Sequence, residues 1–323
     1  MERTFREQLF LLMLCLSVPR GHCRYIEDNE VTEDELFSVL NSDLKREIPE
    51  TSMYGRPLRC LDMVALEGQF TFTAETPALR CAAFFIAEPH KVFSLQYDHV
   101  DVDCRGGDFI KVFDGWVMRG EKFPSPQDHP LPLHDRYVDY CASSELVRRT
   151  GVRSSQNVFM LFFHIRNAGD GFTVTVRQHV NPFPCNIISQ TPEGSFTMVV
   201  PQQHKNCSFS IVYPVELQIS DFSLGHYSDT TVSKRSVTCS EARDFVELLG
   251  GSGLDTSKMS PIAELCTSFT GPTQMKIGCD NTVVRLVSSG RFVNRLTFSY
   301  NLLDQKDLQM IKLNSVDNFC FTN

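Results

Sequence analysis

A run of strand-like landmarks occurs twice in this chain, about 130 residues apart, and it constrains the fold more than any other feature. Three segments recur in the same order: EGQFTF and EGSFTM, DFIKVFDG and DFVELLGG, and GFTVTV and RLTFSY. The first segment of each set follows a cysteine, Cys60 in one copy and Cys185 in the other. A period of this length is that of a domain rather than of a solenoid repeat, so the sequence predicts two tandem domains of one fold.

The cysteines support this duplication. Of the twelve, Cys15 and Cys23 lie in an N-terminal apolar stretch and at its end, which leaves ten. An even number in a secreted chain indicates a disulfide framework, although sequence alone does not fix its connectivity. Joining neighbours within each copy predicts Cys60–Cys81, Cys104–Cys141, Cys185–Cys207, Cys239–Cys266 and, for the remaining two, Cys279–Cys320. The chain has no Cys-x-x-Cys pair, so no structural zinc site is expected.

The N-terminal region reads as a targeting segment followed by a leader. Residues 1–23 place Arg3 and Arg6 before an apolar core of ten residues, which is typical of a secretory signal and too short to span a bilayer. Residues 24–59 form an acidic leader in which Thr32 and Glu35 match a helix capping box. Leucines four residues apart follow, which predicts one short amphipathic helix. No later segment has the length and apolar character of a membrane span.

The rest of the chain is predicted to be all-β. Phenylalanine, of which there are 25, alternates with Val, Ile and Thr in short segments separated by turns, as in an antiparallel β-sandwich. We expect a first domain at 60–180, a proline-rich linker at 181–184, a second domain at 185–300, and a tail at 301–323 that Cys320 ties back. The formal net charge of −8 argues against a nucleic-acid partner.

No motif of a known enzyme class occurs, so the sequence predicts a protein that is not an enzyme. His129 and His134 share a loop that contains four prolines and could touch a metal, although a solvated histidine is the commoner case. An acidic cluster surrounds Cys104 and could hold calcium through carboxylate oxygens, or could simply face water: Asp98, Asp101, Asp103 and Asp108.

Two short motifs point to modification of an extracellular protein. Asn206, in Asn206-Cys207-Ser208, is the single glycosylation sequon with an allowed middle residue. The Lys234-Arg235 pair lies in a polar stretch, where it is either a solvated basic pair or a site at which a protease nicks an exposed loop.

With these motifs in view, the chain resembles CUB domains, which are extracellular jelly-roll sandwiches that bind proteins. Over its mature length it is similar to the corticotropin-releasing factor-binding protein family, on six segments: RPLRCLD at 56–62, GQFTFTA at 68–74, GGDF at 106–109, KVFDGW at 111–116, GEKFPS at 120–125 and DFVELLGG at 244–251. The resemblance implies two tandem CUB-like antiparallel jelly-roll β-sandwiches after a short helical leader. It also implies a secreted, non-enzymatic protein that sequesters corticotropin-releasing factor and urocortin-type peptides.

The resemblance also bears on possible sites. Calcium-binding CUB domains share an aspartate after Phe-x-Ser on a late strand, but here Phe163 is followed by His164-Ile165-Arg166, so calcium is not expected. Part of the hormone contact is expected at Arg56 and Asp62, which flank Cys60; the alternative is a local surface ion pair unrelated to ligand. The alternative function is that of a structural or adhesive CUB pair that joins larger protein surfaces.

Overall fold

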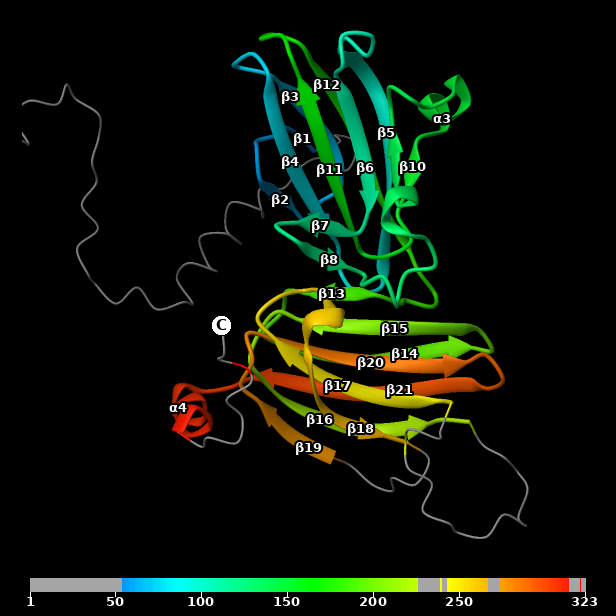
Figure 1. Cartoon of the computed structure of the whole chain (residues 1–323), viewed down its shortest axis with the longest axis vertical. Helices are drawn as coiled ribbons and strands as arrows, with labels where there is room; N and C mark the ends of the chain where they lie inside the picture. The colour runs from blue at the N-terminus through cyan, green and yellow to red at the C-terminus, as the bar shows by residue number, and fades with distance from the viewer. Residues whose placement is uncertain (1–53, 226–238, 240–242, 267–272, 314–319, 321–323) are drawn as a thin grey trace, which may run out of the picture. The chain divides into compact units, whose positions relative to one another are not determined.

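Strands make up most of the described chain and form two β-sandwiches, one from each copy of the repeated pattern (Figure 1). The computed structural model describes residues 54–225, 239, 243–266, 273–313 and 320. The predicted signal, the leader helix and the Lys234-Arg235 pair lie outside these residues. Within the described ranges, no helix is both long and apolar enough to cross a membrane.

The first sandwich consists of two five-stranded sheets, ordered β1-β3-β12-β5-β10 and β2-β4-β11-β6-β9. Their strands are β1 (Gly55–Pro57), β2 (Asp62–Val64), β3 (Gly68–Thr73), β4 (Leu79–Ile86), β5 (Lys91–Asp101), β6 (Phe109–Asp114), β9 (Tyr137–Asp139), β10 (Val152–Arg153), β11 (Val158–Ile165) and β12 (Gly171–Val180). A short helix, α3 (Glu145–Thr150), and a 3-10 turn, η1 (Leu133–Asp135), lie between strands. Pairing is antiparallel except where the edge strands β1 and β2 run parallel to β3 and β4.

The second sandwich repeats this topology, with sheets ordered β13-β15-β20-β17-β18 and β14-β21-β16-β19. Its elements are β13 (Ile187–Ser189), β14 (Glu193–Pro201), β15 (His204–Ile211), β16 (Val215–Ser223), β17 (Phe245–Gly251), η3 (Thr256–Lys258), β18 (Ser260–Leu265), β19 (Thr273–Ile277), β20 (Asn281–Ser289), β21 (Val293–Leu302) and α4 (Gln305–Leu313). The order β2-β4-β11-β6-β9 of one copy corresponds to β13-β15-β20-β17-β18 of the other. The predicted all-β class with two tandem β-sandwiches is thus confirmed.

Alternating burial explains why these segments are strands. In β3 every second residue is buried, which places the phenylalanines between the sheets and the polar residues in solvent. Phe85 and Phe159 stack at the centre of the first core, with ring centroids 4.5 Å apart. The second core holds Phe209 edge-on to Phe298 at 5.2 Å. Such aromatic pairs fix the spacing of the sheets in addition to burying apolar area.

A hairpin covers the outer face of one sheet of the first sandwich. It consists of β7 (Trp116–Met118) and β8 (Glu121–Phe123), joined by Arg119 and Gly120. Both turn residues have positive φ, at 54° and 81°, which matches the twist that a two-residue hairpin requires. Trp116 stacks on Phe84 of β4, with centroids 4.0 Å apart. The sheet is therefore apolar on both faces, and the hairpin shields the outer one.

Five disulfides join the ten cysteines: Cys60–Cys81, Cys104–Cys141, Cys185–Cys207, Cys239–Cys266 and Cys279–Cys320. Two segments differ from the sequence interpretation. Residues 55–57, assigned to the leader, form β1, because this strand pairs with β3 and extends the first sheet. The segment assigned to the tail begins with the end of β21 and then forms α4, whose Asp307 binds Lys276 of β19 at 2.8 Å.

Candidate functional site

Arg56 and Asp62 join the edge strands of the two sheets of the first sandwich. Arg56 lies on β1 and Asp62 on β2, and Arg56 Nη1 is 2.8 Å from Asp62 Oδ2. The same carboxylate oxygen accepts a hydrogen bond from the backbone N–H of Arg59 at 3.3 Å. The side chains are 27% and 17% exposed, so a ligand can still reach both. The structure thus brings the two predicted residues together.

The proline-rich loop at 124–133 is ordered by a buried arginine. Arg136 donates from Nη1 to Pro124 O at 2.6 Å, from Nε to Leu131 O at 2.9 Å and from Nη2 to Ser125 O at 3.3 Å. Burial lowers the pKa of Arg136, although nearby carboxylates partly compensate. A guanidinium with five donors in a fixed fork suits a loop whose prolines supply carbonyl oxygens without amide donors.

This loop carries Asp128 into the second sandwich. The Asp128 side chain is fully buried, and Oδ1 accepts from Arg285 Nε of β20 at 2.8 Å. Oδ2 accepts from Ser208 Oγ at 2.8 Å and from Thr256 Oγ1 at 3.1 Å. Arg285 also pairs with Glu247 of β17. The carboxylate is therefore satisfied entirely by residues of the other sandwich.

We call the contact surface between the sandwiches around Asp128, Asn157 and Glu121 the seam. Besides the contacts of Asp128, it contains those of Asn157 and Glu121. Asn157, which is buried, donates to Ala87 O at 2.7 Å and to Ile188 O at 2.8 Å, and accepts from Ile188 N–H at 2.9 Å. Glu121 Oε2 accepts from the backbone N–H groups of Leu254 at 3.0 Å and Asp255 at 2.9 Å. The seam is thus held by specific polar contacts.

Sequence reasoning missed Asp128, Arg285 and Glu121. Arg285 stands in the otherwise apolar strand segment Val283-Val284-Arg285-Leu286, which is a weak signal for a buried ion pair. The other two are single acids in a loop and a hairpin, and no local pattern marks them.

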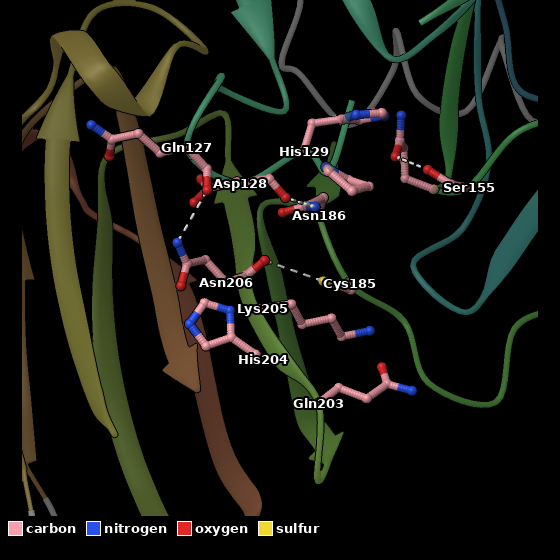
Figure 2. A pocket seen from close by; sticks show the side chains of 12 residues that line it. Gln127, Asp128, His129, Ser155, Cys185, Asn186, Gln203, His204, Lys205 and Asn206 are labelled. Carbon is pink, nitrogen blue, oxygen red and sulfur yellow. Dashed lines mark hydrogen bonds between the residues drawn. The ribbon is translucent and has the colours of Figure 1, made fainter. Parts of the chain in front are cut away.

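A polar cleft of about 550 Å³ lies beside the proline-rich loop (Figure 2). Its lining includes Gln127, Asp128, His129, Asn186, His204, Lys205 and Asn206. The predicted glycosylation residue, Asn206, donates from Nδ2 to Gln127 O at 3.2 Å. A glycan is attached through this nitrogen. A glycan on Asn206 would therefore start inside the cleft, on the nitrogen that donates to Gln127 O.

The candidate metal residues are engaged by the protein. Contrary to the solvated interpretation, His129 is buried; its Nδ1 accepts from Leu131 N–H at 3.0 Å and its Nε2 lies 3.2 Å from Asp114 Oδ2. His134 is exposed. Asp108 accepts from the N–H groups of Arg166 and Asp103, both at 3.0 Å. No group of three or more His, Cys, Asp or Glu side chains with metal-binding geometry occurs among the described residues.

Two family models match the chain, one for each sandwich. The corticotropin-releasing factor binding protein N-terminal domain matches residues 52–180, and the C-terminal domain matches residues 187–309. The chain belongs to the corticotropin-releasing factor-binding protein family. The resemblance stated from the sequence is thereby confirmed, and the family is one of hormone-binding proteins rather than a known enzyme class.

Two relatives of this family match over nearly the whole chain. The corticotropin-releasing factor-binding protein of Homo sapiens is 53% identical, covering 100% of this chain and 99% of its own. The Xenopus laevis protein of that name is 55% identical over 96% of each chain. Among solved structures, the CUB1-EGF-CUB2 domains of rat MASP-1 match 77% of this chain at 13% identity, with a TM-score of 0.27.

Proposed function

We propose that this chain binds corticotropin-releasing factor and urocortin-type peptides and lowers the free hormone concentration at receptors. The observation that carries this proposal is the match of both sandwiches to the family, with relatives named corticotropin-releasing factor-binding protein at 53% and 55% identity over essentially the whole chain. The alternative of an adhesive CUB pair has no comparable support. The chain acts by binding alone and catalyses no reaction.

The protein works outside the cell in this proposal. Five disulfides are typical of secreted proteins, because the cytosol keeps thiols reduced. The apolar segment within residues 1–23 would direct secretion, and Asn206 would carry a glycan on the secreted form. N-terminal sequencing and the mass change on enzymatic deglycosylation of protein from culture medium test both statements.

Arg56 and Asp62 form part of the contact with hormone. Their ion pair leaves hydrogen-bonding capacity free, since Arg56 has further guanidinium N–H groups and Asp62 accepts the bonds from Arg56 and from the Arg59 N–H through the same oxygen, Oδ2. Trapping a dilute hormone requires a Kd near nanomolar, about −12 kcal/mol. Two partly exposed charges supply only a fraction of this, so apolar contacts must provide most of the affinity.

Titration of the purified full-length protein with labelled corticotropin-releasing peptide tests the proposal. We expect saturable one-site binding that unlabelled hormone displaces and a scrambled peptide of the same composition does not. Absence of binding by protein with all five disulfides formed, or equal displacement by the scrambled peptide, would contradict the hormone-trap function.

A further inference from the structure

Exposed apolar side chains gather next to the Arg56–Asp62 pair. Within six residues lie Leu61, Met63 and Leu66, which are 58%, 53% and 39% exposed. Leu61 has a φ of 60°, a left-handed conformation that is unfavourable for a non-glycine residue. Its backbone N–H donates to Ala82 O at 2.7 Å. The fold therefore holds a leucine in a strained conformation with its side chain in solvent, and such strain clusters at functional sites.

Met63 forms one wall of an apolar cleft at the seam. The cleft has a volume of about 280 Å³, and both sandwiches line it. Ile86, Met63 and Trp116 come from the first sandwich, whereas Ile188, Val212 and Leu254 come from the second. Ile86 and Ile188 belong to a buried cluster, against which Trp116, Val212 and Leu254 pack while remaining partly open to solvent. The buried isoleucines therefore form the base of the cleft, and the partly exposed apolar residues line its opening to solvent.

The chemistry of the cleft fits an apolar side chain better than a free small molecule. Its volume falls below the range of about 300–1,000 Å³ that holds a drug-sized ligand. The buried polar residue in its lining, Asn281, already donates to Gly253 O at 2.7 Å and accepts from Ser210 Oγ at 3.0 Å. The Leu254 N–H is bonded to Glu121. The buried interior thus offers apolar contact, whereas the other polar side chains of the lining, Gln190, Ser252 and Asp280, are exposed.

The cleft and the charged pair share an edge strand. β2 pairs with β4 on one side only, and side chains alternate along it, so Asp62 and Met63 face opposite sides. A helix that crosses this edge can place a polar residue toward Arg56 and Asp62 and an apolar residue toward Met63. Helical peptides commonly bind in this way, with apolar anchors in a groove and charges at its rim.

We propose that the cleft between Met63, Trp116, Val212 and Leu254 is the apolar subsite for the hormone, and that it takes one apolar anchor side chain of the peptide bound as a helix. This inference rests on the proposed function. Because each sandwich supplies one wall, hormone binding requires the seam to be closed. The exposed side chains of Leu61 and Met63, on either side of Asp62 in the sequence, add apolar surface at this edge.

Trp116 is the only tryptophan of the chain and lines the cleft, so its fluorescence reports occupancy directly. The experiment titrates full-length protein with a hormone peptide that contains no tryptophan, while a label on the peptide measures binding independently. We expect a blue shift of Trp116 emission and reduced quenching by acrylamide, both saturating at the same peptide concentration as the label. Binding of labelled peptide with no change at Trp116 would overturn the subsite.

Charged substitutions on each wall of the apolar cleft provide a second test of the subsite. Met63→Glu and Val212→Glu are each expected to weaken peptide binding by at least tenfold. Met310→Glu and Val293→Glu are the matched controls, because these residues are 60% and 53% exposed and do not line the cleft. If wild-type protein binds hormone and the wall variants match their controls, the subsite is wrong while the hormone trap stands. If wild-type protein binds no hormone, the proposed function fails instead.

Discussion

The carboxylate of Asp128, on a loop of the first sandwich, lies 2.8 Å from the guanidinium of Arg285 on β20 of the second. Burial alone would lower the pKa of Arg285, but the charges of Asp128 and Glu247 and the hydrogen bonds to them raise it above its usual value. Arg285 therefore stays charged, and the pair fixes the two sandwiches to each other. The apolar cleft and the polar cleft both depend on this seam.

We expect Arg285→Ala to lower the free energy of unfolding by about 3–5 kcal/mol, because it leaves Asp128 as a buried carboxylate without a counter-charge. Denaturant unfolding of oxidised protein measures the loss. Arg295→Ala is the matched control, since its ion pair with Asp221 is exposed and should contribute at most about 1 kcal/mol. Equal losses in the two variants would contradict a clamping role for Arg285.

Acid should weaken the seam through Glu121. Burial raises the pKa of this carboxyl, but the hydrogen bond from Lys258 and those from the N–H groups of Asp255 and Leu254 together lower it below its ordinary value. A folded-state pKa below the unfolded one stabilises the protein above the unfolded pKa, and this contribution is lost as the pH falls through the folded pKa. Wild-type protein should therefore exceed Glu121→Gln in Tm at pH 7, and the gap should close in acid. A gap that stays constant from pH 7 down to pH 3 would show that ionised Glu121 is not responsible.

Arg56→Ala and Asp62→Ala should each weaken hormone binding more than twofold, while lowering the unfolding free energy by at most about 1 kcal/mol. Peptide titration and thermal melting measure the two effects. The exchange variant, with Arg56→Asp and Asp62→Arg together, keeps an ion pair between β1 and β2 but reverses its charges. Direct contact predicts that this variant recovers its Tm but not its affinity. Full recovery of affinity would instead assign the pair a purely structural role.

Calcium removal should leave the melting temperature unchanged. In the first copy the two oxygens of Asp108 accept backbone N–H groups, and the Arg166 guanidinium donates to Gly106 O beside them. In the second copy Asp244 accepts from Ser289 and Asn294. These carboxylates already have partners, so a cation would have to displace them. A drop of several degrees with chelator, reversed by calcium, would contradict this prediction.

The sequence by itself determined the fold class, the two-domain repeat and the family. Period-two burial, paired cysteines and turn residues are local signals, and the second copy allowed each to be checked against the first. The strands β3 and β4, for example, were visible from alternating phenylalanines and a buried apolar run alone.

The tertiary structure decided the seam and the clefts. Asp128 and Arg285 are 157 residues apart, and no sequence pattern around either residue indicates that the other is its partner. The sequence likewise gives Met63 no role; it becomes part of a cleft because β2 takes the sheet edge beside residues of the second sandwich. Local sequence patterns indicate which face of a strand or helix is buried. They do not indicate which distant residues pack against that face, because this depends on how the complete sheets pack together.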